Sequence, residues 1–157
     1  MRVFIDIDTQ RDFMESTGAL YVPGAEERVA NIRELTRLAT KYGIQILGSV
    51  DEHYGDEAHK CAEGELKRWD GPFPDHCMVG TEGAKKINVD KGWCEEMLSD
   101  AVYIPMLLEG ETDPKNTSGV VPLSHGKPMF FRKQTYDVFS NPYLAPTLRH
   151  LNVTEAI

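Results

Sequence analysis

The residues of this chain best suited to bind a metal ion are an aspartate and two histidines. Asp51 and His53 are two positions apart, and His76 follows in a long polar stretch. In an extended segment Asp51 and His53 point to the same side, because side chains alternate along it. A carboxylate with two imidazoles suits zinc, iron or manganese, and three protein ligands leave positions open for water or substrate. The pattern predicts a metal site; the alternative is a loop histidine that merely neighbours a carboxylate.

A second pair of groups suited to acid–base chemistry is Asp8 with Lys133. Asp8 follows a short apolar run, and a carboxylate beside the interior of a sheet is costly unless it is paired. Lys133 follows the apolar run 128–132, and an ammonium group next to Asp8 would hold both groups in their charged forms. The alternatives are that Asp8 and Asp12 only cap the turn after the strand, and that Lys133 is a solvated lysine.

The three cysteines offer little obvious chemistry. Cys61, Cys77 and Cys94 are odd in number and make no Cys-x-x-Cys pair, so neither a disulfide framework nor a thiolate zinc cluster is expected. Cys77 stands beside His76, and Cys–His pairs do form thiolate nucleophiles. Adjacent residues rarely point at each other, so Cys77 is a weak candidate. The sequence has no glycine-rich phosphate-binding motif, which leaves nucleotide binding without support.

The elements that must position these groups begin with a strand, a helix and a second strand. Residues 3–7 and 44–50 are short apolar runs, typical of strands buried in a parallel sheet. Residues 25–42 have apolar side chains at helical spacing and end before Gly43. The helix is expected to bury one stripe: Val29, Ile32, Leu35 and Leu38. A βαβ unit makes its strands parallel, so the polar groups after both strands meet at one edge of the sheet, where ligands bind.

The rest of the chain predicts a long loop and further sheet elements. Residues 54–85 are rich in Gly, Pro, Asp and His, and a loop of this length is usually functional or disordered; we favour a functional loop. Three elements are expected after it: strands over 101–107 and 128–132, and a helix over 142–151. Residues 152–157 turn and begin another strand, which suggests that the sequence is incomplete.

Composition limits the class of protein. The chain has 157 residues, of which 41% are hydrophobic and 27% charged, as in a soluble single domain. Its formal net charge of −8 argues against nucleic acid as a partner, because phosphate binding needs a basic surface. No apolar run approaches the roughly 20 residues that cross a bilayer, and no basic leader region precedes the first strand. We expect a cytoplasmic homo-oligomer that acts on a small molecule, with no nucleic-acid or membrane partner.

Four segments, in this order, carry a resemblance to one family. They are Ile5–Phe13 (IDIDTQRDF) with Gly18–Ala25 (GALYVPGA), Asp51–His53 (DEH), Phe73–Gly83 (FPDHCMVGTEG) and Arg132–Ser140 (RKQTYDVFS). Their order and spacing resemble the isochorismatase-like cysteine hydrolases, and most closely the nicotinamidases (pyrazinamidases). The resemblance covers nearly the whole chain. It implies a three-layer α/β/α fold with a mostly parallel, Rossmann-like sheet.

The resemblance also implies roles for the site residues. Asp8 would be the general base that activates a cysteine thiol, and Lys133 would hold Asp8 charged and help to position the thiolate. A divalent metal would be held by the three residues named above, Asp51, His53 and His76; zinc is the first choice, with iron and manganese as alternatives. In nicotinamidases this metal holds the pyridine nitrogen of the substrate. A glutamate sometimes joins the metal shell, here Glu63 or Glu65. Phe13 and Trp69 are expected to form aromatic walls of a flat-ring pocket.

The chain departs from the family at its end. In the family the nucleophilic cysteine lies at the end of the strand that follows a Leu-x-Val-Thr-Glu-Ala-like segment, which is here residues 151–157. We therefore expect residues 1–157 to be a C-terminally incomplete single domain, with the nucleophile beyond Ile157, and this chain alone to be inactive. None of the three cysteines present matches that position.

The function implied is an amidase of NAD metabolism that converts nicotinamide to nicotinate and ammonia. The thiolate would attack the amide carbonyl, ammonia would leave, and water would hydrolyse the thioester. Three alternatives stay open: another substrate of isochorismatase-like enzymes, a metal–water hydrolase that uses Asp51, His53 and His76 without a cysteine, and a metal-binding or ligand-binding relative without turnover.

Overall fold

The computed structural model describes residues 1–57, 60, 64–87, 100–106 and 126–157, and the structural statements below concern those residues. Their five strands form one sheet in the order β3-β4-β2-β1-β5, with every pair parallel. The strands are β1 (Arg2–Ile7), β2 (Gln45–Asp51), β3 (Val102–Ile104), β4 (Met129–Lys133) and β5 (Glu155–Ala156). The helices are α1 (Arg11–Met14), α2 (Val29–Lys41) and α4 (Leu144–His150), with 3-10 turns η1 (Glu26–Arg28), η3 (Lys67–Trp69) and η5 (Val138–Ser140).

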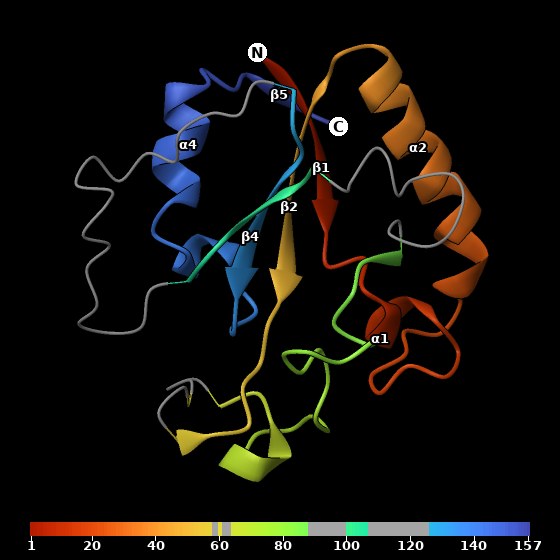
Figure 1. Cartoon of the computed structure of the whole chain (residues 1–157), viewed down its shortest axis with the longest axis vertical. Helices are drawn as coiled ribbons and strands as arrows, with labels where there is room; N and C mark the ends of the chain where they lie inside the picture. The colour runs from red at the N-terminus through yellow and green to blue at the C-terminus, as the bar shows by residue number, and fades with distance from the viewer. Residues whose placement is uncertain (58–59, 61–63, 88–99, 107–125) are drawn as a thin grey trace.

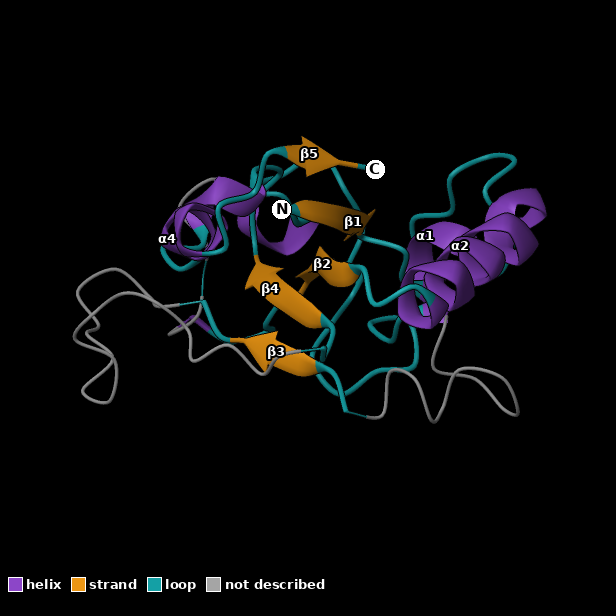
Figure 2. Ribbon diagram, turned by 90° about the horizontal axis from the view of Figure 1, so that it is seen from above, coloured by secondary structure: helices purple, strands orange, loops and turns teal. Residues whose placement is uncertain are grey.

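The helices cover both faces of the sheet (Figure 1). Seen from above, α4 lies on one side of the strands and α1 and α2 lie on the other (Figure 2). This arrangement confirms the three-layer α/β/α fold and the parallel β1–α2–β2 unit predicted from the sequence. The carboxyl ends of the central strands therefore share one edge of the sheet.

Two apolar clusters hold the layers together. Neighbouring residues of a strand point to opposite faces, so Leu47 and Phe131 join the cluster beneath α4, while Ile46 and Phe130 join the cluster beneath α2. All four side chains are buried. Burial of an apolar side chain of this size contributes about 1.5–3 kcal/mol. The demand for apolar residues on both faces explains why the strand segments were recognisable as continuous apolar runs.

The helix predicted over residues 25–42 is present as η1 followed by α2, but its buried face differs from the predicted stripe. Leu35 is 45% exposed, whereas Thr36 and Ala39 are buried. Ala39 packs in the cluster with strand residues, so the helix approaches the sheet through a small side chain. The Thr36 hydroxyl donates to the carbonyl of Ile32 at 3.0 Å, which satisfies a polar group on the buried face. The prediction that Leu35 is buried was therefore wrong.

The two central strands each run one residue further than predicted. Asp51 is the last residue of β2 and Lys133 the last residue of β4, rather than residues at the exits. The two are paired in the parallel register of these strands. The third predicted strand, 101–107, is shorter, spanning Val102–Ile104, and residue 107 lies outside the described part of the chain.

A buried ion pair ties the loop after residue 80 to β1. Asp6 and Lys86 are 4% and 1% exposed, and Lys86 Nζ lies 3.2 Å from Asp6 Oδ1. Thr9 donates to the same carboxylate oxygen at 2.6 Å, and the ammonium group lies 4.5 Å from the centre of the Phe130 ring. The sequence showed that a carboxylate inside the sheet needs a partner, but not which residue supplies it.

None of the helices in the described ranges is long and apolar enough to cross a membrane.

Candidate active site

The carboxyl ends of three neighbouring strands bring together the two parts of the candidate site. Asp8 follows β1, Asp51 ends β2 and Lys133 ends β4. Lys133 Nζ lies 2.9 Å from Asp8 Oδ2 and also forms a short ion pair with Asp51 Oδ1. The register explains the second contact, because Asp51 and Lys133 stand opposite each other on adjacent strands. One ammonium group thus links the predicted acid–base pair to the predicted metal ligands.

The Asp8 carboxylate is held from two sides. Ser49 Oγ donates to Asp8 Oδ1 at 2.7 Å, while Lys133 contacts the other oxygen. The backbone of Asp8 has a φ of 49°, a left-handed conformation that turns the chain away from the sheet directly after β1. Its side chain is 22% exposed, so one part of the carboxylate still faces solvent. A general base needs this combination of a fixed position and access.

Lys133 carries its charge despite its burial. Burial alone would lower the pKa of this lysine, but the carboxylates of Asp51 and Asp8 outweigh it and raise the pKa above its ordinary value. Burial raises the pKa of Asp51, and the Lys133 ammonium opposes that rise. The ammonium group is therefore the charge that allows two carboxylates to share this edge of the sheet.

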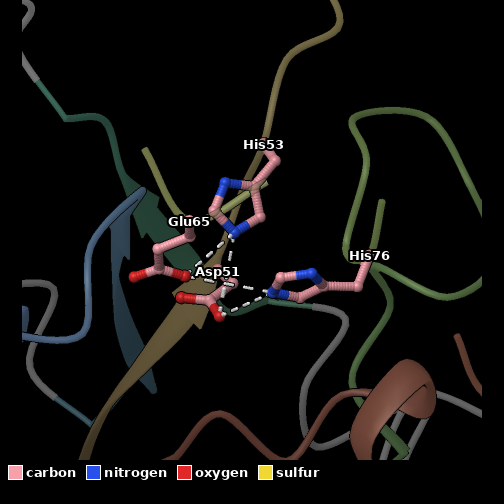
Figure 3. A group of neighbouring side chains, drawn as sticks. All are labelled: Asp51, His53, Glu65 and His76. Atoms are coloured by element: carbon pink, nitrogen blue, oxygen red, sulfur yellow. Dashed lines mark ion pairs between the residues drawn. The ribbon is translucent and has the colours of Figure 1, made fainter. Parts of the chain in front are cut away.

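Beside Asp8 and Lys133, four side chains converge in an arrangement that suits a metal ion (Figure 3). One ligand atom from each of Asp51, His53, Glu65 and His76 lies within 4.8 Å of the others, and all four residues are buried. His53 Nε2 lies 3.6 Å from Glu65 Oε2, and His76 Nε2 lies 3.8 Å from Asp51 Oδ2. Two ligand atoms that each lie about 2.0–2.1 Å from one zinc ion are about 3.4 Å apart at tetrahedral angles, so the separations here are only slightly longer than those of a zinc site.

The long loop supplies two of these groups by folding back on the exit of β2. The His53 amide donates to Cys77 O at 3.1 Å, and the Val79 amide donates to His53 O at 2.9 Å, which aligns residues 76–79 with His53. Glu65 O accepts from the Phe73 amide at 3.0 Å. The described part of the loop predicted to be functional is therefore anchored by backbone hydrogen bonds. Of the two glutamates left open by the sequence, Glu65 lies in the group and Glu63 lies outside the described residues.

The surroundings of the His53 and His76 rings suit the binding of a metal ion by both residues. His76 Nδ1 lies 2.8 Å from Pro74 O and donates to it, so the other ring nitrogen, Nε2, faces the group. His53 Nε2 is buried and makes no hydrogen bond to any residue that the structure describes. Burial, with the charges of His76 and Lys133, lowers the pKa of His53 to about 4, so its ring is neutral at pH 7. A buried nitrogen without a hydrogen bond beside two carboxylates is what a cation would satisfy.

A cavity of about 380 Å³ opens onto both parts of the site. Asp8, Asp51, Glu65, His76 and Lys133 line its polar end. Its apolar walls include the following side chains: Phe13, Leu20, Val22, Phe73 and Tyr136. The size and the aromatic walls suit a small, flat ring with a polar substituent.

The structure places the two predicted wall residues differently. Phe13 lines the cavity, with its ring centre 5.5 Å from that of His76. Trp69 is not among the described residues around the cavity, and its ring instead lies 5.2 Å from Lys60 Nζ. Phe73 and Tyr136, whose rings are in edge contact at 6.0 Å, line the cavity and were not singled out in the sequence. Both belong to the segments that carry the family resemblance, which was the available signal.

Cys77 is poorly suited to be a nucleophile. Its side chain is fully buried, and burial, together with the nearby carboxylates of Asp51 and Asp12, raises the pKa of its thiol far above the ordinary value. The thiolate is the reactive form. We therefore expect native Cys77 to react with iodoacetamide at least about tenfold more slowly than in the denatured protein, as measured by peptide mass spectrometry. Equal rates would show that the thiol is accessible and ionisable.

Comparison with known proteins shows the fold. No protein-family model and no curated protein matches the chain. The pyrazinamidase of Pyrococcus horikoshii in complex with zinc is 21% identical with a TM-score of 0.62, over 99% of this chain and 67% of that one. The pyrazinamidase/nicotinamidase of Streptococcus mutans is 22% identical with a TM-score of 0.65, over 99% and 69%.

A third neighbour has a different substrate in its name. The N-carbamoylsarcosine amidase of Thermoplasma acidophilum is 17% identical with a TM-score of 0.58, over 99% of this chain and 64% of that one. The chain therefore has the isochorismatase-like α/β fold predicted from its sequence and spans about two thirds of the length of these proteins.

Proposed function

We propose that this chain forms most of a metal-dependent cysteine amidase of the isochorismatase-like family, which converts nicotinamide to nicotinate and ammonia. The observation that carries the proposal is the position of Lys133. Its ammonium group contacts both Asp8 and Asp51, so an acid–base pair and a metal-binding group open into one cavity. Similarity of fold to pyrazinamidases and nicotinamidases supports the same reaction class.

Each residue of the cavity would have its own role in the reaction. Asp8, fixed by Ser49 and Lys133, would take the proton of an attacking thiol and return a proton to the leaving ammonia. Lys133 would pair with the Asp8 carboxylate and lie close to the negative charge of the thiolate. The aromatic rings of Phe13 and Phe73 would hold the flat ring of the substrate and exclude water from it.

Asp51, His53, Glu65 and His76 would hold a divalent metal, for which we propose zinc. When bound, the metal would supply a Lewis-acidic position for the ring nitrogen of the substrate. The zinc complex of the structurally similar pyrazinamidase supports this choice.

The thiol of this mechanism is proposed to come from beyond Ile157. The strand β5 runs parallel to β1, and Ile157 continues the pairing through hydrogen bonds of 3.0 Å with Val3 and Ile5. A continuation of β5 in the same direction would pass beside the end of β1, where Asp8 lies. The attack would form a thioester with loss of ammonia, and water would then release nicotinate and the thiol.

One alternative function is favoured by a specific feature. The group of four candidate ligands contains no thiol, and Asp8 lies beside it in the same cavity, where its carboxylate would take a proton from an attacking water molecule. A metal held by the four residues would supply Lewis-acid chemistry without a cysteine. We further propose a role in NAD metabolism, since nicotinamide is the proposed substrate, and a cytoplasmic location.

The test combines intact mass with ammonia release from nicotinamide on the same sample. A mass above the 17.7 kDa of residues 1–157, with turnover that iodoacetamide abolishes, would support the cysteine mechanism. Zinc-dependent turnover at 17.7 kDa that survives iodoacetamide would support the metal–water alternative. A longer, zinc-loaded protein that releases no ammonia from nicotinamide would contradict the proposed function.

A further inference from the structure

Two residues between Asp8 and Phe13, Gln10 and Asp12, take no part in the chemistry above, yet Gln10 bonds to the backbone of Asp51 and Asp12 bonds to the backbone amide that follows His76. We propose that they are positioning residues that hold the backbone of two predicted metal ligands, Asp51 and His76, at a fixed separation. The inference rests on the metal site of the proposed function, and it adds residues that touch neither metal nor substrate.

Gln10 holds Asp51 through both of its backbone groups. Gln10 Oε1 accepts from the Asp51 amide at 2.7 Å, and Gln10 Nε2 donates to Asp51 O at 2.7 Å and to Ala84 O at 2.8 Å. The side chain is fully buried. Only a carboxamide supplies an acceptor and a two-proton donor in this space, because a carboxylate would face two carbonyl oxygens.

The reason for this contact lies in the sheet register. Strand β1 pairs with β2 only as far as Ile7 opposite Ser49, because the chain turns away at Asp8. The backbone groups of Asp51 on that side would otherwise face no strand. The Gln10 side chain makes the hydrogen bonds that a further residue of β1 would otherwise make. The backbone of Asp51, the last residue of β2, is therefore held in place like the rest of the strand.

Asp12 acts on the other ligand through the neighbouring peptide. Asp12 Oδ2 accepts from the Cys77 amide at 2.6 Å, directly after His76, and Asp12 Oδ1 accepts from the Ala19 amide at 3.0 Å. Cys77 has a φ of 45°, a conformation that a residue with a side chain rarely adopts without support. A charge-assisted hydrogen bond to its amide supplies that support.

The close approach of Asp12 to the loop around Gly83 depends on the glycine at that position. A side chain at Gly83 would place its Cβ 2.2 Å from the Asp12 carboxylate, so only glycine fits there. The Asp12 amide in turn donates to Gly83 O at 3.0 Å. The carboxylate is therefore enclosed between three loop segments rather than free on the surface.

Together these contacts connect ligands from two different elements. Asp51 belongs to β2 and His76 to the long loop, and the segment 10–12 bonds to the backbone of Asp51 and of Cys77, the residue after His76. The 3.8 Å between Asp51 Oδ2 and His76 Nε2 is then set in part by a segment whose own side chains lie outside the shell. Loss of such support typically weakens metal affinity by about 10–100-fold.

The test is metal affinity of Asp12→Asn, measured by competition of Zn²⁺ against a chelator, with the absorption spectrum of the Co²⁺-loaded protein as a second readout. The matched control is Asp137→Asn, since Asp137 also accepts a backbone amide, that of Phe139 at 2.8 Å, but in η5. We expect zinc affinity to fall about tenfold or more in Asp12→Asn, with a changed Co²⁺ spectrum, and both to stay unchanged in Asp137→Asn. The melting temperature of the metal-free proteins, measured in parallel, shows whether each variant is folded.

The outcomes separate this inference from the proposed metal site. If the unmodified chain binds zinc and folded Asp12→Asn binds it equally well, with the same Co²⁺ spectrum, the positioning role is wrong. If the unmodified chain binds no zinc, the metal site and this inference both fail. If Asp12→Asn does not fold, Gln10→Glu is measured in the same way, and an affinity equal to that of the unmodified chain overturns the proposal.

Discussion

Replacing Lys133 with methionine is expected to lower the free energy of unfolding by about 3 kcal/mol or more, because removal of one partner from a buried ion pair leaves an uncompensated charge. Lys133 is 3% exposed and contacts both Asp8 and Asp51. Methionine keeps most of the apolar stem but leaves two carboxylates at one edge of the sheet without their cation. Urea denaturation monitored by circular dichroism measures the change.

The matched control is Lys127→Met. Lys127 also pairs with a carboxylate, Asp100 at 3.3 Å, but its side chain is 46% exposed. An exposed ion pair contributes about 1 kcal/mol at most, so this variant should unfold almost as the unmodified chain does. Equal small losses in the two variants would contradict a central role for Lys133. Adding Asp51→Asn to Lys133→Met should recover part of the lost stability, since one of the two carboxylates becomes neutral.

Replacing His76 with alanine is expected to weaken zinc binding by about 100-fold. Four-ligand zinc sites have apparent binding free energies of about 10–16 kcal/mol, or roughly 3 kcal/mol for each ligand. His76 presents Nε2 to the group while its Nδ1 is held by Pro74 O, so the ring is oriented before any metal arrives. Isothermal titration calorimetry with Zn²⁺ measures the affinity.

His150→Ala serves as the control for this experiment. His150 is the exposed last residue of α4, on an element that contributes nothing to the four-residue group. Its removal should leave zinc affinity unchanged. A loss of affinity in both variants would point to binding by surface histidines, and unchanged affinity in His76→Ala would remove this residue from the predicted ligands.

The strands and the helix that position the site could be predicted because burial and helix termination leave patterns within short stretches of sequence. The strands β1, β2 and β4 contribute side chains to the clusters on both faces of the sheet and are therefore largely apolar. Gly43, with a φ of 63°, ends the helix where the sequence indicated. Once the βαβ unit is assigned, parallel pairing alone brings Asp8 and Asp51 to one edge. The nearness of Lys133 to Asp8 was predicted for the same reason, from its place after an apolar run.

The features that could not be predicted from the sequence are contacts between segments that are distant in the chain. Lys86 lies 80 positions from Asp6 in the chain, and nothing local to either residue indicates the partner. Lys133 contacts Asp51 as well as Asp8 because β2 and β4 pair in one particular register, which no periodicity reveals. Glu65 joins the group through the path of a loop that lacks a repeating pattern, so the sequence offered Glu63 and Glu65 equally, and Glu63 lies outside the described residues. The predicted burial of Leu35 failed since a helix can pack through small residues on a neighbouring stripe.

The measurement that tests the proposed metal site most directly is anomalous X-ray diffraction at the zinc edge from crystals of this chain grown with Zn²⁺. We predict one strong peak about 2.0–2.2 Å from ligand atoms of Asp51, His53, Glu65 and His76. We also predict that Lys133 remains between Asp8 and Asp51. An empty group, or a peak only at surface histidines, would contradict the metal site and, with it, the proposed amidase.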